Sequence, residues 1–231
     1  MTARAIPIVA LDVGNADEAL RVARSVVEYC RFFKVGLELY TAEGPGVVRR
    51  LKDELGADIF LDLKLHDIPN TVAGAVKSAR KLGVRLLTVH ASGGDEMLLA
   101  AQDAADGMLG LLGVTVLTSM TEASLQRASG SSLVSIEDEV VRRSDAAAAA
   151  RLQGIVCSGH EATAVRRAHP RLEILVPGIR LPDSASGDQR RVMTPLAAEA
   201  AGATYIVLGR AVTAAPNPRE VMAQVSGQLG G

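Results

Sequence analysis

The chain of 231 residues contains only two cysteines, Cys30 and Cys157. Both lie inside apolar segments, and neither belongs to a C-x-x-C pair. This scarcity argues against a disulfide framework, so we expect two buried thiols in a protein of a reducing compartment. The sequence also lacks a G-x-G-x-x-G segment after its first apolar run, which leaves a dinucleotide-binding sheet without support.

An excess of either charge is missing as well. Lysine and arginine total 25 against 26 aspartates and glutamates, which gives a formal net charge of -1. We therefore expect no nucleic-acid partner, and an anionic ligand would have to be met by local cations. No apolar run reaches the roughly 18 residues of a spanning helix, and the run before Asp12 is too short for a signal peptide. We expect a cytoplasmic protein that does not contact the membrane.

The chain does contain a regular alternation of two patterns. Short apolar runs rich in β-branched residues are each followed by a stretch with helical periodicity. The predicted strands are 6–11, 32–37, 59–63, 86–90, 113–117, 154–157, 174–176 and 205–208. The predicted helices are 16–30, 43–55, 71–82, 95–105, 135–152, 161–168, 195–201 and 218–229.

This alternation predicts the fold. Nearly continuous apolar strands separated by helices indicate a parallel sheet that is buried on both faces. Eight such units fit a closed (β/α)8 barrel better than an open doubly wound sheet. We expect one α/β domain over residues 1–231, a TIM barrel.

One predicted strand carries charges among its apolar residues. Asp62 and Lys64 alternate with leucines, and the two-residue period of a strand places both on one face. Holding such charges near a barrel interior costs several kcal/mol per ion unless partners compensate, so the arrangement indicates chemistry rather than structure alone. Asp67 follows just past this strand.

Other polar residues fall at the ends of the remaining strands. The C-terminal ends of barrel strands form the working face of this fold. Asp12 ends the first strand, and Lys34 lies within the second, where its charge needs a partner. Thr118 and Ser119 end the fifth strand. A structural ion pair remains an alternative for Asp62 and Lys64, but the added charges of Lys34 and Asp67 favour a catalytic network.

The last two strands end in residues suited to bind phosphate. Gly209 and Arg210 follow the eighth strand, where barrels build phosphate sites from backbone N–H groups and a cation. Arg180 follows the seventh strand, and Gln189 lies in a Pro, Ser and Gly-rich loop over residues 181–191 that we expect to act as a lid. We expect a phosphorylated small molecule, bound at one end by Arg210 and modified at the other by Lys64.

These motifs resemble the orotidine 5'-monophosphate decarboxylase family in its bacterial form, over nearly the whole chain. The family's Asp-x-Lys-x-x-Asp signature is similar to Asp62-Leu-Lys64-Leu-His-Asp67, which Ile-Pro-Asn-Thr71 follows. The further matching segments are Ala10-Leu-Asp12, Phe33-Lys34-Val-Gly36, Val114-Thr-Val-Leu-Thr118-Ser119, Pro177-Gly-Ile-Arg180, Gly187-Asp-Gln189-Arg-Arg191 and Gly209-Arg210.

The resemblance implies a TIM barrel that forms a homodimer and converts orotidine 5'-monophosphate to UMP without a metal or an organic cofactor. By this resemblance Lys64 protonates C6 of the pyrimidine, and Asp62 crowds the substrate carboxylate. Asp67 and Thr71 would enter the partner subunit's site. The resemblance further implies that Asp12 and Lys34 hold ribose hydroxyls, and that Thr118 and Ser119 contact the pyrimidine edge. It also implies that Arg180, Gly209 and Arg210 bind the phosphate. Gln189 would bridge the phosphate and the base.

Three other functions remain open at this point. Magnesium-dependent sugar-phosphate decarboxylases and aldolases of the same superfamily share the Asp-x-Lys-x-x-Asp pattern, but they place an acidic residue where this chain has Lys34. A Schiff-base aldolase would use Lys64 or Lys34 as its nucleophile. A non-catalytic phosphate-binding protein would bind nucleotide without turnover. His66 and His90 lack further ligands at metal-binding spacing, so we expect no metal site there.

Overall fold

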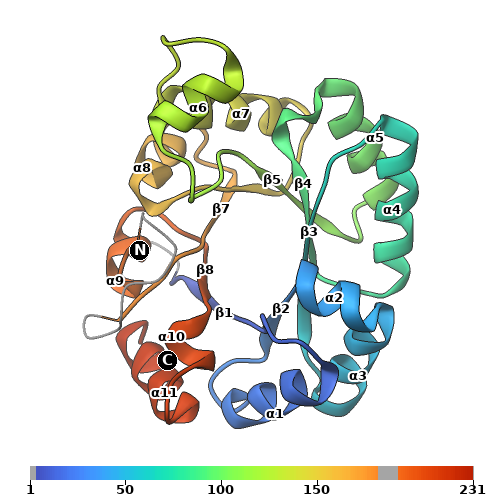
Figure 1. Cartoon of the computed structure of the whole chain (residues 1–231), viewed down its shortest axis with the longest axis vertical. Helices are drawn as coiled ribbons and strands as arrows, with labels where there is room; N and C mark the ends of the chain where they lie inside the picture. The colour runs from blue at the N-terminus through green and yellow to red at the C-terminus, as the bar shows by residue number, and fades with distance from the viewer. Residues whose placement is uncertain (1–3, 182–191, 231) are drawn as a thin grey trace.

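The computed structural model describes residues 4–181 and 192–230. Eight parallel strands pair in chain order, and β8 pairs with β1 to close the barrel (Figure 1). The strands are β1 (Ile6–Ala10), β2 (Phe32–Gly36), β3 (Asp58–Leu65), β4 (Leu86–His90), β5 (Gly110–Val114), β6 (Gly154–Val156), β7 (Glu173–Val176) and β8 (Tyr205–Leu208). The predicted closed (β/α)8 barrel is confirmed.

The helices form a ring around the strands (Figure 1). They are α1 (Ala16–Val26), α2 (Leu37–Glu43), α3 (Pro45–Leu55), α4 (Pro69–Lys81), η1 (Ala91–Gly93), α5 (Asp95–Ala105), α6 (Glu122–Ser129), α7 (Ile136–Ala149), α8 (Gly159–Ala168), α9 (Pro195–Ala200), α10 (Arg210–Thr213) and α11 (Pro218–Gln228). The first and last of these, α1 and α11, lie side by side and complete the ring. Within the described part of the chain, every helix is too short or too polar to cross a membrane.

Several predicted boundaries differ from the observed ones. The prediction for the fifth strand, 113–117, was three residues late, because β5 begins at Gly110, which pairs with Leu86 of β4. The apolar run there continues on both sides of the strand, so its pattern does not mark the end. Three α-helices, α2, α6 and the short α10, were not predicted. The third strand is longer than predicted and extends to Leu65.

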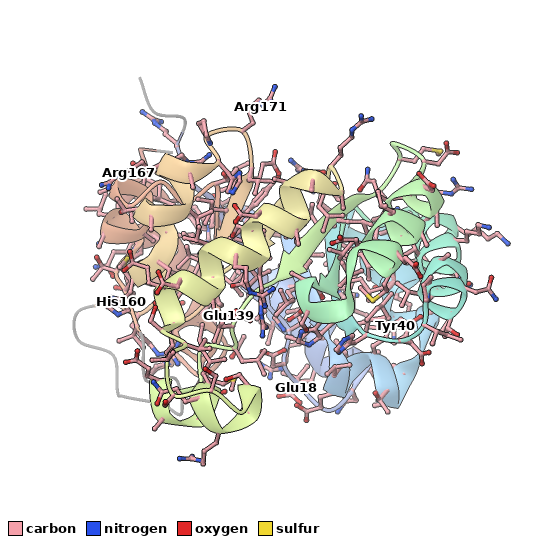
Figure 2. All side chains as sticks on the ribbon, turned by 90° about the horizontal axis from the view of Figure 1, so that it is seen from above. Glu18, Tyr40, Glu139, His160, Arg167 and Arg171 are labelled. Atoms are coloured by element: carbon pink, nitrogen blue, oxygen red, sulfur yellow. The ribbon has the colours of Figure 1, made fainter. Side chains whose placement is uncertain are left out.

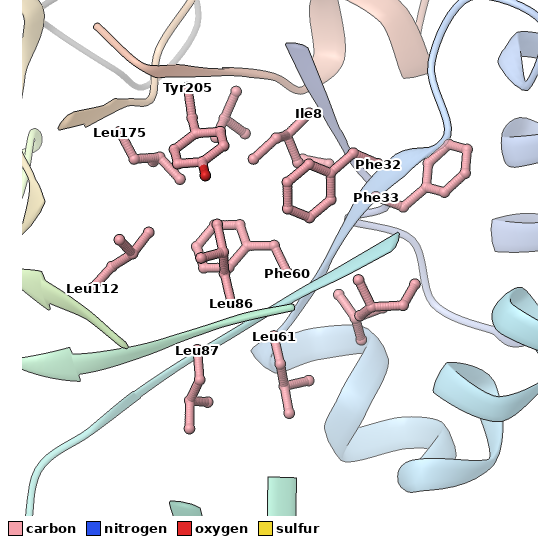
Figure 3. Packing of buried hydrophobic residues seen from close by; sticks show 14 of the residues in the cluster. Ile8, Phe32, Phe33, Phe60, Leu61, Leu86, Leu87, Leu112, Leu175 and Tyr205 are labelled. Atoms are coloured by element: carbon pink, nitrogen blue, oxygen red, sulfur yellow. The ribbon is translucent and has the colours of Figure 1, made fainter. Parts of the chain in front are cut away.

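Large apolar side chains form a tier in the barrel interior. Ile8, Phe60, Leu86 and Tyr205 point toward the barrel axis, whereas Leu61 points outward to the helices (Figure 3). Each of these side chains is 2% exposed or less, and burying one of this size contributes about 2 kcal/mol. Successive inward positions on a strand lie two residues apart. The inward positions two residues after this tier, toward the C-terminal end of each strand, therefore belong to the C-terminal rim.

Candidate active site

A cavity of about 470 Å³ opens at the C-terminal ends of the strands. Its volume suits a small ligand. Its apolar lining residues include Ala10, Phe60, Val114, Val116, Val156, Leu175 and Val207. Its charged lining residues are Asp12, Lys34, Glu38, Asp62, Lys64, Arg180 and Arg210. The cavity therefore combines an apolar base with charges of both signs around its rim.

Lys34 is the most buried charge of this site. It follows Phe32 by two residues on β2, and its side chain is only 10% exposed. Its Nζ lies 2.6 Å from Oδ1 of Asp12 and 3.8 Å from Oδ2 of Asp62. The two carboxylates compensate the cost of removing this ammonium group from water. Gly36 leaves room for the pair, because a Cβ there would lie 2.8 Å from Lys34 Nζ and 2.9 Å from Asp12 Oδ1.

Lys64 stands beside Asp62, as the alternating pattern predicts. Its Nζ donates to Oδ2 of Asp62 at 2.8 Å, and its side chain remains 31% exposed toward the cavity. The backbone of Lys64 is in the left-handed region, with φ of 49°. A non-glycine residue held there costs on the order of 1 kcal/mol or more, and such residues are concentrated in active sites. The strand period alone did not predict this conformation.

Asp62 joins the two lysines into one network. Its Oδ2 faces both ammonium groups, and its Oδ1 accepts a hydrogen bond of 2.9 Å from the hydroxyl of Thr88 on β4. Asp12, Lys34, Asp62 and Lys64 therefore form a line of alternating charges across three neighbouring strands. Thr88 was not identified from the sequence, because a threonine within an apolar strand is ordinary.

The side of the cavity that follows β7 and β8 carries two guanidinium groups. Arg180 follows β7, and Arg210 begins α10 directly after Gly209. Burial and the neighbouring charge of Arg210 lower the pKa of Arg180. An anion bound between the two cations would relieve that repulsion. Gly178 has a φ of 77°, a conformation that glycine adopts without strain, and it turns the chain after β7 toward the cavity.

The residues that flank the predicted lid lie together at this wall. Ile179 pairs with Met193, and the Arg180 N–H donates to the Met193 carbonyl at 2.9 Å. Of the predicted loop over 181–191, only Leu181 is described. Gln189, predicted to bridge phosphate and base, lies outside the described residues.

Thr118 lines the cavity from the turn after β5, and Ser119 follows it in the same turn without lining the cavity. This turn is anchored through Thr115. The Thr115 hydroxyl donates to the Val156 carbonyl at 2.7 Å, and the Thr115 carbonyl accepts a hydrogen bond from Arg143 of α7. Glu139, labelled in Figure 2, accepts from Arg143 Nε at 2.6 Å. Hydrogen bonds from Arg142 and Arg143 lower the pKa of Glu139.

Asp67 and Thr71 do not line the cavity of their own chain. Asp67 is exposed in the bend between β3 and α4, where its Oδ1 accepts from the Ile68 N–H at 2.7 Å. Thr71 is exposed on the first turn of α4. The side chain between them, Ile68, is apolar and 67% exposed. Both predicted site residues thus stand on the outer surface beside the rim.

Two histidines lie near the charged network. The rings of His66 and His90 are 5.2 Å apart between centroids. Burial lowers the pKa of His90, and the nearby His66, Arg143 and Lys64 lower it further. Among residues 4–181 and 192–230, no three histidine, cysteine or acidic side chains lie close enough to hold a metal ion.

Glu38 is a further cavity residue that was not predicted. It lies on the first turn of α2, which begins directly after Gly36. The sequence interpretation extended the second strand to residue 37 and missed this helix. The change from strand to helix at Gly36 is what brings Glu38 to the cavity.

Comparisons with known proteins agree with this geometry. Residues 6–225 match the model of the family described as "Orotidine 5'-phosphate decarboxylase / HUMPS family". The chain is 43% identical over 229 residues to orotidine 5'-phosphate decarboxylase of Pseudomonas paraeruginosa, covering 96% of this chain and 97% of that protein. It is 44% identical to the enzyme of the same name from Pseudomonas fluorescens, covering 96% of each. The crystal structure of orotidine 5'-phosphate decarboxylase from Lactobacillus acidophilus superposes with a TM-score of 0.86 at 31% identity, covering 99% of this chain and 100% of that one.

Proposed function

The chain belongs to the orotidine 5'-phosphate decarboxylase / HUMPS family, and from this membership we propose that it converts orotidine 5'-monophosphate to UMP in de novo pyrimidine biosynthesis. The observation that carries the proposal is the cavity itself. It holds an alternating line of two carboxylates and two ammonium groups at one wall and two guanidinium groups at the other. A nucleotide suits this arrangement, because its reacting ring can lie at the line of carboxylates and ammonium groups while its remote phosphate lies at the guanidinium groups.

The two walls take the two ends of the substrate. Arg180 and Arg210 bind the phosphate, with the backbone of Gly209 beside them and Gln189 bridging phosphate and base. Asp12 and Lys34 hold ribose hydroxyls, while Thr118 and Ser119 meet the edge of the pyrimidine. This arrangement directs C6 and its carboxylate toward Lys64 and Asp62. Binding energy from the phosphate, which does not react, then helps to hold the reacting carbon in place.

The chemical step breaks the bond between C6 and the carboxylate carbon. CO2 leaves, and the electron pair stays on C6 as a poorly stabilised carbanion. Lys64 stabilises the developing charge and delivers a proton to C6, after which its amine regains a proton from solvent. Asp62 disfavours the substrate carboxylate by repulsion, and together with Lys34 it keeps the ammonium group of Lys64 in position.

This reaction is proposed to run without a metal ion. A divalent cation at the carboxylates would have to approach Asp62 beside two ammonium groups, one 2.8 Å and the other 3.8 Å from its Oδ2. Like charges at that separation oppose the binding of a cation. The same feature disfavours magnesium-dependent sugar-phosphate chemistry. Both lysines are held in ion pairs with carboxylates, Lys34 with Asp12 and Lys64 with Asp62, and this disfavours either one as a Schiff-base nucleophile.

The assembly belongs to the proposal as well. A homodimer whose subunits donate Asp67 and Thr71 across the interface would account for two predicted site residues that are exposed and do not line their own cavity. The exposed Ile68 between them would be covered by the partner. Mixing a Lys64→Ala subunit with an Asp67→Ala subunit should then restore activity that neither variant has alone. One catalytic domain over residues 1–231 and a cytoplasmic location stay predictions.

The direct test is an assay of the purified protein with orotidine 5'-monophosphate in the presence of EDTA. We expect UMP and CO2 to form at the same rate with and without the chelator. Turnover that requires added magnesium would contradict the metal-free reaction. Absence of turnover, with activity on a 3-keto sugar phosphate plus magnesium, would replace the proposal by the sugar-phosphate alternative. Covalent trapping by borohydride would indicate a Schiff base, and nucleotide binding without turnover would indicate a binding protein.

A further inference from the structure

Thr88 connects the two central residues of the cavity through a single hydroxyl group. The residue is fully buried, on the inward face of β4. Its Oγ1–H donates to Oδ1 of Asp62 at 2.9 Å, and the same oxygen accepts from the backbone N–H of Lys64 at 2.9 Å. One hydroxyl therefore fixes the side chain of Asp62 and the main chain of Lys64 at the same time.

The pairing of β3 with β4 explains why this hydroxyl is needed. Leu61 pairs with Leu87 and Leu65 pairs with Val89, so the register shifts between these two pairs. Three residues of β3, from Asp62 to Lys64, therefore face Thr88 alone on β4. In a regular ladder the amide of Lys64 would find a backbone carbonyl. Here the threonine hydroxyl accepts that hydrogen bond instead.

The same irregularity carries the strained backbone. Lys64 has a φ of 49°, which a lysine does not hold without support. At the observed register, relaxation of Lys64 into an extended conformation would break its 2.9 Å hydrogen bond to the fully buried Thr88 hydroxyl, so this bond opposes relaxation. The bond to Oδ1 sets the rotation of the Asp62 carboxylate, so that Oδ2 faces Lys64 at 2.8 Å and Lys34 at 3.8 Å.

We propose that Thr88 is a positioning residue that holds the ammonium group of Lys64 and the carboxylate of Asp62 in their reactive arrangement. The inference rests on the proposed decarboxylase function and deepens it, because Thr88 is not among the residues that line the cavity and would act through Asp62 and Lys64. Its role is in the chemical step, which depends on Asp62 and Lys64, rather than in phosphate binding by Arg180 and Arg210. Misplacing a catalytic group by about 1 Å can cost 10²-fold in rate.

Two substitutions and one control separate this role from general packing. Thr88→Val keeps the branched shape and removes the hydroxyl, whereas Thr88→Ser keeps the hydroxyl and removes a methyl group. The control is Thr204→Val, because the Thr204 hydroxyl also accepts a backbone N–H from a neighbouring strand, that of Ile174 at 3.2 Å. Thr204 directly precedes β8 and lies at the opposite end of the barrel from the cavity.

For decarboxylation of orotidine 5'-monophosphate, we expect Thr88→Val to lower kcat by about 10- to 100-fold with KM changed by less than about threefold. Thr88→Ser should remain within about fivefold of the wild-type kcat, and Thr204→Val within about twofold. Wild-type kcat in Thr88→Val would overturn the proposal, as would a Thr88→Ser variant as slow as Thr88→Val. A loss in KM alone would also overturn it, because it would assign Thr88 to binding.

A crystal structure of Thr88→Val tests the positional claim without any substrate. We expect the Asp62 carboxylate to rotate and its hydrogen bond to Lys64 Nζ to be lost. An unchanged Asp62 and Lys64 would refute the role of Thr88. An inactive wild-type protein would instead refute the proposed function, and the crystal structure would still decide whether Thr88 holds the pair.

Discussion

Both ends of the barrel carry charged residues, and β3 contributes to both, but the charges are held differently. At the N-terminal end, Arg85 pairs with Asp58 at 2.8 Å, and its guanidinium group lies 4.9 Å from the centroid of the Phe32 ring. Both partners are about half exposed, at 43% and 55%. At the C-terminal end, the Lys34 side chain is 10% exposed and lies between two carboxylates.

We interpret the difference as one between an end that stabilises the barrel and an end that serves the proposed reaction. The pair at the N-terminal end is hydrated, and such surface pairs contribute about 1 kcal/mol or less. The C-terminal rim concentrates four charges around a cavity and holds Lys64 in a strained conformation. On β3 the two ends are only a few residues apart, since Asp58 begins the strand and Asp62 reaches the cavity. The inward tier that contains Phe60 separates them.

The strongest test of this comparison exchanges a carboxylate for an amide at each end of β3. Asp62→Asn should lower kcat by about 10²- to 10³-fold, because the lysines lose the charge that fixes them and the substrate carboxylate is no longer repelled. Asp58→Asn should leave kcat within about twofold, since it breaks only an exposed pair. Steady-state kinetics on both variants measures the contrast. Equal losses would show that the two ends are not functionally distinct.

A second test removes an arginine at each end. Arg210→Ala should raise KM by about 10- to 100-fold, because a charge-assisted contact to the phosphate is lost. Arg85→Ala should leave KM unchanged and lower the free energy of unfolding by about 1 kcal/mol, through loss of the Asp58 pair and the contact with Phe32. Titrations with substrate and with urea measure the two quantities. An unchanged KM in Arg210→Ala would place the phosphate elsewhere.

A third test concerns the strain at the rim. Lys64→Gly should be more stable than Lys64→Ala by about 1 kcal/mol, because glycine adopts a φ of 49° without steric cost. Lys34 is not in the left-handed region, so Lys34→Ala should be more stable than Lys34→Gly. Glycine weakens a regular strand by about 0.5 to 1 kcal/mol relative to alanine. Urea unfolding of the four variants compares the pairs. The same order at both positions would argue against strain at Lys64.

The smallest predicted effect is a pH dependence of stability that comes from Tyr205, at the N-terminal end of the barrel. Burial, and a hydrogen bond with Glu173, raise the pKa of Tyr205 to about 12 from 10. Its raised pKa means that the folded state holds the proton more tightly, so the stability this provides is present below pH 10 and is lost as pH rises toward 12. Tyr205→Phe should flatten the fall in the unfolding midpoint over that range.

Cys30 adds a similar but separable contribution. Burial raises the pKa of its thiol to about 11 from 9, so its contribution is lost over a lower range than that of Tyr205. Measuring Tyr205→Phe in a Cys30→Ala background isolates the tyrosine. An equally steep fall with and without Tyr205 would assign the pH dependence to other groups.

The sequence predicted the barrel and most of the rim because both follow from short-range patterns. Apolar runs mark the eight strands, and charges at their ends mark the working face. The adjacency of Asp62 and Lys64 followed from the strand period, but the left-handed backbone of Lys64 comes from a register shift between two strands. Pairing between strands distant in sequence is not encoded in a local pattern.

Other omissions have different causes. Thr88 is an ordinary strand residue by propensity, and its role appears only when β4 lies beside β3. Glu38 was missed because the strand prediction continued past Gly36. By contrast, α6 had a readable signal: Thr121 and Ser124 form a capping box at its start, and Gly130 ends it in the left-handed conformation.

The most direct measurement of the central claim is the turnover of Lys64→Ala, taken together with its unfolding midpoint in urea. If Lys64 serves the chemical step, decarboxylation of orotidine 5'-monophosphate in EDTA should fall by about 10⁴-fold while the variant stays folded and binds UMP. A folded Lys64→Ala variant that retains turnover within about tenfold of wild type would contradict the assignment of Lys64 as the proton donor.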